Sequence, residues 1–190
     1  AADLEAALAR ELTGRAERVD AVVLSDYRSG VLTPRLVAAA LATERLIAVD
    51  SQGHLDAFRG ATVIKCNRAE AERFLGYPLA TTAERAARLT DLYRELGCQL
   101  LVVTLGGEGA ALVSAEGYRE FPPPAVRNVF DVTGAGDTVL ALLAAALACG
   151  ATPDEALTLA QLAAGIVIGK FGNAQATREE LVAAIEEYLA

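Results

Sequence analysis

The stretch Asp131-Val132-Thr133-Gly134-Ala135-Gly136-Asp137 leads directly into an apolar segment at 138–149, and this junction organises the chain. Its two glycines let the backbone turn tightly and remove side chains that would keep an anion away from the amides. A helix that starts here directs its first unpaired N–H groups and the positive end of its dipole at the loop. The sequence therefore predicts a phosphate site formed by the amides of Gly134, Ala135 and Gly136.

Asp137 closes this loop and calls for a different role. A carboxylate beside an anion site repels the anion, so Asp137 is a poor phosphate ligand. It suits a base for a hydroxyl group that attacks a phosphoryl group held by the loop. The alternative is a glycine turn followed by an acidic residue in the first turn of a helix, which is ordinary helix chemistry. A motif this short leaves both interpretations open.

Length and composition indicate one globular domain over residues 1–190, because 53% of the residues are hydrophobic and 22% are charged. The net charge of -8 argues against a general nucleic-acid binder, which would carry a basic surface. No apolar run reaches the roughly 18 residues that a membrane helix needs. We therefore expect neither nucleic acid nor a membrane as a partner.

The cysteines and the N-terminus give expectations about location and completeness. Cys66, Cys98 and Cys149 are widely spaced and form no paired motif, which is typical of reduced thiols in a cytoplasmic protein. Ala1 opens directly onto a helical pattern, so we expect no signal peptide. Because the chain contains no Met, we expect that upstream sequence is missing and that this is a fragment.

Strand and helix patterns alternate along the chain. Strands are expected at 21–24, 46–49, 62–65, 100–105 and 126–129, with a hairpin at 110–113 and 118–121. Helices are expected at 2–18, 33–43, 68–75, 81–96, 136–149, 154–168 and 177–189. Repeated strand-helix units predict an α/β fold with a mostly parallel central sheet and helices on both faces. Ligands bind beyond the carboxyl ends of such strands, where Asp26, Asp50, Asn67, 104–109 and the central loop fall.

Asn67 and Glu70 form the second candidate for chemistry. At the start of a helix they share one face, where an amide and a carboxylate could organise a hydrated Mg²⁺ beside phosphates. Asn at an N-cap with Glu three residues later is also a capping box. The local sequence leaves these two interpretations equally open.

The third candidate is the glycine-rich segment from Thr104 to Gly109, in which Gly106 and Gly107 also let phosphates approach the backbone. Thr104 can donate a hydroxyl hydrogen bond to a nucleotide. A hairpin turn is the alternative, since a strand follows. Other nucleotide folds are disfavoured, because neither lysine of the chain lies in a Walker A loop and the dinucleotide fingerprint fails at Val139 and Leu112.

These segments together carry a family resemblance. The stretch 131–138 resembles the second signature of the ribokinase-like (PfkB) carbohydrate kinases, and Asn67-x-x-Glu70, Thr104-Leu105-Gly106 and Ala163-Ala164-Gly165 follow in the family's order. Within that family, 23–27, 58–62 and 163–170 are similar to the heptose 7-phosphate kinase domain of ADP-heptose synthesis. The resemblance implies a ribokinase-like sandwich that lacks the N-terminal part and the lid.

The resemblance also implies roles. Asp137 would be the base, and Gly134, Ala135 and Gly136 the anion hole. The partners would be a sugar or sugar phosphate with ATP and Mg²⁺, and a homodimer is left open. Asn67 and Glu70 would lie near Mg²⁺, and Thr104, Gly106, Gly107 and Gly109 near the ATP phosphates. Asp131 and Thr133 would help to hold a monovalent cation such as K⁺. The segment 164–173, including Asn173, would lie near the adenine.

The chain departs from the heptose kinases at three points. It has Asp26-Tyr27-Arg28-Ser29-Gly30 where they usually show Asp-Tyr-Gly-Lys-Gly, and Asp50-Ser51-Gln52-Gly53 where they usually show Asp-Pro-Lys-Gly. Cys66 stands where Pro commonly precedes the Asn. A non-catalytic nucleotide-binding or assembly module of the same fold is therefore the alternative to a kinase, although binding alone gains nothing from the carboxylate of Asp137.

Overall fold

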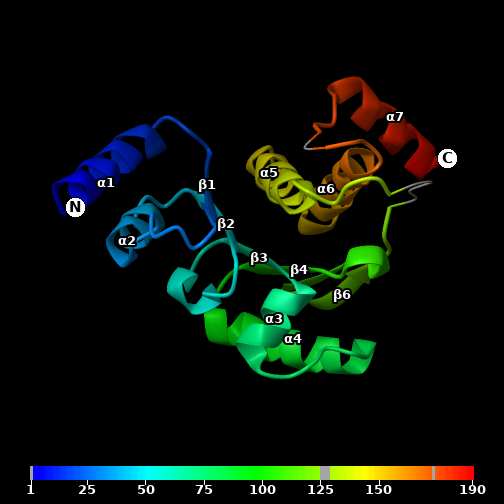
Figure 1. The fold of residues 1–190 in the computed structure, drawn as a ribbon, viewed down its shortest axis with the longest axis horizontal. Coiled ribbons are helices and arrows are strands. Elements are labelled where there is room, and N and C mark those ends of the chain that lie inside the picture. Colours follow the sequence, from blue (N-terminus) through cyan, green and yellow to red (C-terminus); the bar gives the residue numbers. More distant parts are fainter. Residues whose placement is uncertain (1, 125–128, 173) are drawn as a thin grey trace.

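The computed structural model describes residues 2–124, 129–172 and 174–190. A six-stranded sheet in the order β1-β2-β3-β4-β5-β6 forms its centre (Figure 1). Strands β1 to β4 are parallel, and β5 and β6 continue the sheet as an antiparallel hairpin. The strands are β1 (Ala21–Asp26), β2 (Leu46–Ser51), β3 (Val63–Asn67), β4 (Leu100–Thr104), β5 (Ala110–Ser114) and β6 (Gly117–Phe121). The predicted α/β fold with a mostly parallel sheet is confirmed.

Helices cover both faces of this sheet (Figure 1). Helices α2, α3 and α4 lie on one face, α5 and α6 pack together on the other, α1 contacts α2, and α7 contacts α6. Short 3-10 turns occur at η1 (Leu55–Phe58) and η2 (Gly106–Glu108). The helices are α1 (Ala2–Ala16), α2 (Pro34–Leu41), α3 (Arg68–Leu75), α4 (Thr82–Leu96), α5 (Ala135–Ala148), α6 (Pro153–Ile168) and α7 (Arg178–Leu189).

Side-chain caps explain why several helices begin where they do. The sequence has a Thr with Glu three residues later at Thr81 and Glu84 and again at Thr177 and Glu180, a pattern that predicts capping boxes. Both boxes are present, and each satisfies two otherwise unpaired N–H groups. Thr33 caps α2, and Pro34 lies in the first turn, a position that suits proline. Local sequence therefore sets these boundaries before any tertiary contact is made.

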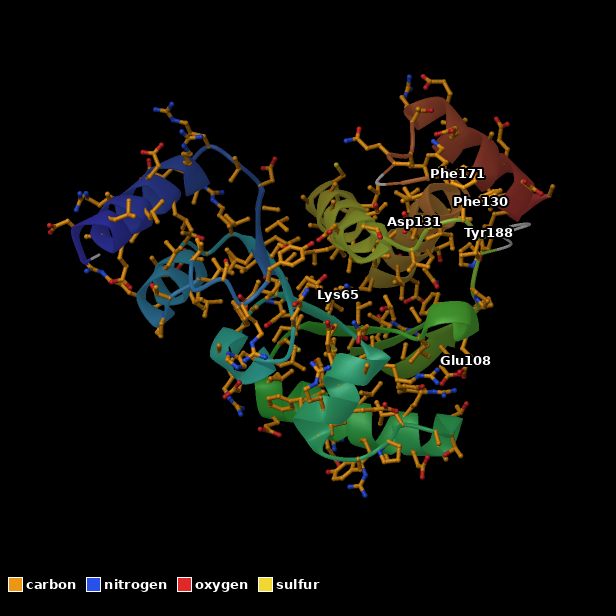
Figure 2. The ribbon with its side chains drawn as sticks, in the orientation of Figure 1. Lys65, Glu108, Phe130, Asp131, Phe171 and Tyr188 are labelled. Carbon is orange, nitrogen blue, oxygen red and sulfur yellow. The ribbon has the colours of Figure 1, made fainter. Side chains whose placement is uncertain are left out.

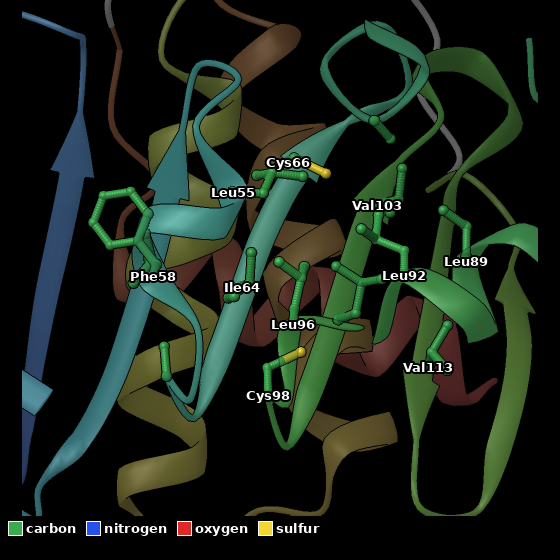
Figure 3. Packing of buried hydrophobic residues seen from close by; sticks show 14 of the residues in the cluster. Leu55, Phe58, Ile64, Cys66, Leu89, Leu92, Leu96, Cys98, Val103 and Val113 are labelled. Carbon is green, nitrogen blue, oxygen red and sulfur yellow. The ribbon is translucent and has the colours of Figure 1, made fainter. Parts of the chain in front are cut away.

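Two apolar cores, one on each face, hold the layers together. The core under α3 and α4 contains Phe58, Ile64 and Val103, together with the thiols of Cys66 and Cys98 (Figure 3). Burial raises the pKa of both thiols, and all three cysteines of the chain are free, as predicted. The second core lies under α5 and α6.

The strand register determines which polar side chains meet. In β1, β2 and β3, Ser25 pairs with Asp50, and Asp50 pairs with Lys65. Because side chains alternate between faces, these residues share the face that holds Ala48 and Val63, which pack with α5 and α6. The carboxyl ends of the parallel strands thus present polar groups to the start of α5.

Part of the predicted strand at 126–129 lies outside the described residues, and Val129 belongs to no strand. Within the described ranges, no helix is both long and apolar enough to cross a membrane.

Candidate functional site

A small polar cavity of about 170 Å³ opens where the carboxyl ends of β1, β2 and β3 meet the N-terminus of α5. Side chains from segments more than a hundred residues apart line it, and most of them are charged or can form hydrogen bonds. Its lining residues are Ser25, Asp26, Tyr27, Asp50, Gln52, Lys65, Asn67, Glu70, Gly136 and Asp137. Two of the predicted candidates, the 134–137 loop and the 67–70 pair, are therefore brought to one place.

The backbone of the glycine loop has the conformation that the sequence predicts. Gly134 is the N-cap of α5 and has a left-handed φ of 79°, a conformation that side chains strongly disfavour. The Ala135 amide donates to the carbonyl of Val132 at 3.2 Å, so this amide is engaged within the loop. The amides of Gly134 and Gly136 have no acceptor among the described residues, so both could donate to an anion, as the sequence predicts.

Lys65 of β3, labelled in Figure 2, extends its side chain to the first turn of α5, where its Nζ lies close to Gly136. A Cβ atom added to Gly136 would come within 2.8 Å of Lys65 Nζ, so a larger residue there would make this ammonium group shift. Lys65 donates to Asp50 Oδ2 at 2.6 Å, and its side chain is 4% exposed. A fixed positive charge therefore lies beneath the backbone donors of the loop.

Sequence reasoning missed Lys65 and noted Asp50 only as a strand end. A signal was available, because Lys65 is the one charged residue in the otherwise apolar start of β3 (Val63–Asn67). It also lies two residues before Asn67, which places both side chains on the same face of the strand. An ion pair between neighbouring strands becomes visible only when the register of the sheet is known.

The carboxylate of Asp137 faces this cavity from the first turn of α5. Its Oδ2 atom accepts a hydrogen bond of 2.6 Å from the hydroxyl of Tyr27, which follows β1. This bond to a carboxylate raises the pKa of Tyr27 above its ordinary value, so the phenol stays protonated and donates at neutral pH. Sequence reasoning named Tyr27 within a resemblance and gave it no role.

Asn67 and Glu70 form the complete capping box of α3. Asn67 Oδ1 accepts from the Glu70 amide at 2.9 Å, and Glu70 Oε2 accepts from the Asn67 amide at 2.7 Å. Both residues nevertheless line the cavity, and each retains a second polar atom beyond the cap. The two interpretations of this motif are therefore compatible, since the cap fixes the side chains at the wall of the cavity.

The glycine-rich segment after β4 (Leu100–Thr104) forms a tight turn that leads into β5. Gly109 has φ +94°, and a Cβ there would come within 2.0 Å of the Phe121 carbonyl oxygen, so this glycine is explained by close packing. Gly106 and Gly107 have open space where a side chain would be. The hairpin-turn interpretation therefore accounts for Gly109, and the first two glycines keep room for a ligand.

Glu108 anchors this turn to two helices. Its carboxylate contacts Arg68 at 2.6 Å, at the start of α3, and Arg85 at 3.3 Å, in α4. Arg85 is 4% exposed and also binds Glu120 of β6 at 2.7 Å. The turn is therefore fixed relative to the helix that begins with Asn67 and Glu70.

The remaining candidates lie apart from the polar cavity. Asp131 Oδ1 accepts from the amide of Thr133 at 2.9 Å, and this bond lowers the pKa of Asp131. Asp131 lies beside Phe130 and Phe171, whose ring centroids are 4.5 Å apart (Figure 2). Among the described residues, no group of three or more His, Cys, Asp or Glu side chains could hold a metal ion. Asn173 lies outside the described residues.

A second, larger groove of about 810 Å³ lies between β6, α6 and α7. Aromatic, proline and small side chains form most of its wall, which is typical of a surface that binds a flat apolar group. The wall includes Pro122, Pro123, Phe130, Gln161, Gly165, Ile166, Gly169 and Tyr188. Three of these residues belong to the 164–173 segment predicted to lie near an adenine.

A comparison with known families gives the class of this protein. Residues 33–180 match the family described as pfkB family carbohydrate kinase. This match covers most of the chain and includes both the 67–70 motif and the 131–137 loop. The chain belongs to the pfkB family of carbohydrate kinases.

Individual relatives and solved structures agree with this family. Proteins named bifunctional protein HldE are 42% identical over 170 residues in a Nitratiruptor species and 41% identical over 188 residues in Paramagnetospirillum magneticum. The matches cover 89% and 94% of this chain but 36% and 38% of those proteins. The chain therefore spans less than two fifths of the length of these relatives.

Among solved structures, the fold is similar to that of Arabidopsis thaliana ribokinase complexed with ribose and ATP, with a TM-score of 0.81 and 21% identity. It is also similar to Escherichia coli phosphofructokinase-2 in complex with potassium, with a TM-score of 0.82 and 21% identity. The matches cover 92% and 96% of this chain, and 58% and 62% of those chains. The ribokinase-like fold is thereby confirmed.

The contact between Tyr27 and Asp137 predicts a measurable titration. The carboxylate raises the pKa of the Tyr27 phenol, so Asp137→Asn should lower the pH at which this phenol ionises. The measurement is phenolate absorbance against pH, taken as the difference between the protein and its Tyr27→Phe variant, with and without Asp137→Asn. Asp154→Asn changes a half-buried acidic residue in the first turn of α6, which pairs with Arg119 of β6, and should leave the midpoint unchanged.

Proposed function

We propose that the chain is the C-terminal part of a kinase that transfers a phosphoryl group from ATP to a hydroxyl of a sugar or sugar phosphate. The observation that carries this proposal is the convergence of three groups at one cavity. The free amide of Gly136, the ammonium of Lys65 and the carboxylate of Asp137 meet at the N-terminus of α5. Two of these groups attract a phosphoryl group, and the third accepts a proton from an attacking hydroxyl.

In the proposed reaction, the acceptor oxygen forms a bond to the γ-phosphorus of ATP as the bond between that phosphorus and the β–γ bridging oxygen breaks. ADP leaves with the electron pair of the broken bond, and the proton of the acceptor hydroxyl passes to Asp137. Because the transition state of phosphoryl transfer is loose, orientation and charge neutralisation dominate over the strength of the base. A carboxylate at a helix N-terminus is adequate for this task.

Mg²⁺ would be held on the side of the cavity where Asn67 and Glu70 lie. Glu70 fits such an ion, because it keeps one carboxylate oxygen beyond the cap and Mg²⁺ prefers oxygen ligands. The Asn67 atom left beyond the cap is the amide nitrogen Nδ2, which would donate to a phosphate or to a water on the ion. When bound, the ion neutralises charge on the phosphates. Thr104, Gly106 and Gly107 would border the same phosphates, and Gly109 would hold the shape of their turn.

The larger groove between β6, α6 and α7 would take the adenine of ATP. Its apolar wall includes Gly165, Ile166 and Gly169, and the 164–173 segment up to Asn173 is proposed to border the base. Asp131 and Thr133 are proposed to hold a monovalent cation such as K⁺, since the E. coli phosphofructokinase-2 was solved with potassium. The exposed carboxylate of Asp131 supplies the necessary negative charge.

The acceptor that we favour is a heptose 7-phosphate, because identity to proteins named HldE extends over most of the chain. Gln52 and Arg28 replace residues that heptose kinases usually have, so other sugar phosphates belong in the first test. The alternative is a non-catalytic nucleotide-binding or assembly module. That alternative gives the Tyr27-bound carboxylate of Asp137 no purpose.

The deciding experiment measures ADP release by the full-length protein with Mg-ATP and heptose 7-phosphate, fructose 6-phosphate or ribose. Turnover with one of these acceptors supports the kinase and names its substrate. ATP binding without turnover on any of them supports the non-catalytic module. Failure to bind ATP contradicts both.

Asp137→Asn should lower kcat by about 10²- to 10⁴-fold while the affinity for ATP stays nearly unchanged, because the variant loses the proton acceptor and keeps the shape of the loop. Steady-state kinetics and ATP titration measure the two quantities. Asp154→Asn is the matched control, since Asp154 also lies in the first turn of a helix. An unchanged kcat would remove Asp137 from the role of base.

Glu70→Gln should separate the cap from the metal site. A Gln at this position still accepts from the Asn67 amide, so the free energy of unfolding should change by less than about 1 kcal/mol. The Mg²⁺ concentration that gives half-maximal activity should rise about tenfold or more, because the charged ligand is lost. Glu84→Gln makes the same change in the capping box of α4 and should alter neither quantity. An unaltered Mg²⁺ requirement in Glu70→Gln would show that Glu70 serves only in the capping box of α3 and is not a ligand of Mg²⁺.

Lys65→Met should weaken ATP binding by about tenfold or more, because a buried ammonium below the anion site is lost. It should also destabilise the fold, since Asp50 is left without its partner. The double variant Lys65→Met with Asp50→Asn should recover much of that stability without recovering ATP affinity. Chemical denaturation and ATP titration distinguish the two effects, and recovery of affinity in the double variant would show that Lys65 is only structural.

A further inference from the structure

The hydrogen bond between Tyr27 and Asp137 joins two segments that lie 110 residues apart in the chain. Tyr27 follows β1 (Ala21–Asp26) on the same face of the sheet as Ser25, and Asp137 lies in the first turn of α5. Tyr27 is 58% exposed, so burial of its ring does not explain its position. The phenol reaches across the mouth of the polar cavity to one atom, Asp137 Oδ2.

The backbone that carries Tyr27 is fixed on both sides by Asp26. Asp26 Oδ1 accepts from the Arg28 amide at 2.9 Å, and Oδ2 accepts from the Ser51 hydroxyl at 3.0 Å. The Asp26 carbonyl also accepts from the Gln52 amide at 3.2 Å. Arg28 has a φ of 58°, a left-handed conformation that is uncommon for a residue with a side chain. The turn that presents Tyr27 is therefore held by several bonds to the end of β2.

This arrangement constrains the carboxylate of Asp137. An aspartate in the first turn of a helix can rotate, and each of its two oxygens could face solvent or substrate. The bond from Tyr27 occupies Oδ2, and Oδ1 accepts no hydrogen bond from the described residues, so it can accept from a second donor. Holding a reacting group in one orientation lowers the barrier of a reaction whose catalysis rests on alignment.

We propose that Tyr27 is a positioning residue, which holds Oδ2 of Asp137 so that Oδ1 receives the proton of the acceptor hydroxyl. The proposal rests on the kinase function proposed above and adds to it a residue outside the phosphate loop. Ser51 supports it indirectly, because its hydroxyl binds Asp26, and the Pro that heptose kinases usually have at this position could not donate that bond. The phenol acts through the carboxylate and not on the substrate itself.

The test is a double-mutant cycle in the full-length protein, with Mg-ATP and each of heptose 7-phosphate, fructose 6-phosphate and ribose. Tyr27→Phe should lower kcat about tenfold, the size expected for losing one hydrogen bond to a charged group, and should change the KM for ATP by less than about twofold. In the Asp137→Asn background, Tyr27→Phe should cause no further decrease, because its effect passes through the carboxylate. Tyr77→Phe changes another exposed tyrosine, which stacks on Arg88 away from the cavity, and should leave kcat unchanged.

The outcomes separate this inference from the proposed function. Full activity of Tyr27→Phe, with activity lost in Asp137→Asn, overturns the positioning role and leaves the kinase in place. An equal fold-decrease in both backgrounds also overturns it, because Tyr27 would then act independently of Asp137. Full activity of Asp137→Asn overturns the proposed base and, with it, the role of Tyr27.

If none of the three acceptors turns over, the phenolate titration still tests whether Tyr27 binds Asp137 in solution, which the inference requires. A Tyr27 midpoint that falls in Asp137→Asn supports the contact in solution. A midpoint that Asp137→Asn does not move overturns the inference without any assay of activity.

Discussion

The site depends on the ion pair between Lys65 and Asp50, which lies at the floor of the cavity under the first turn of α5. A buried ammonium needs a partner, and Asp50 supplies one on the neighbouring strand at 2.6 Å. The pair also lies close to position 136, since a Cβ there would come within 2.8 Å of Lys65 Nζ and the ammonium would have to shift. Sheet register, helix position and the glycine of the loop are therefore coupled through one charge.

Charges of both signs surround this ion pair. Lys65 contributes positive charge beneath the Gly136 amide, and Asp137 and Glu70 contribute negative charge at the wall. The ammonium of Lys65 is balanced by Asp50, and it lies beside the positive end of the α5 dipole. In the proposed kinase, the donors for a phosphoryl group are therefore the amides at the start of α5 and the Lys65 ammonium, and the carboxylates at the wall suit a proton acceptor and a cation.

Several features of the molecule could be predicted from residues alone. The glycine loop, the start of α5 and the capping boxes of α4 and α7 follow from local rules, and each was confirmed. The order of strands and helices also follows from the spacing of apolar residues, which recur about every two residues in strands and every 3.6 residues in helices. The strand predicted at 126–129 is not tested as a whole, since 126–128 lie outside the described residues.

The sequence by itself determined the fold class, the family motifs and the residue types that could hold a phosphate or accept a proton. Tertiary structure decided which of them meet: Lys65 with Asp50 across 15 residues, and Tyr27 with Asp137 across 110. It also placed Gly109 against the Phe121 carbonyl and showed that the Asn67–Glu70 cap faces the cavity. The physical reason is that capping and periodicity act between near neighbours, whereas these contacts depend on strand register and helix packing, which the whole chain sets together.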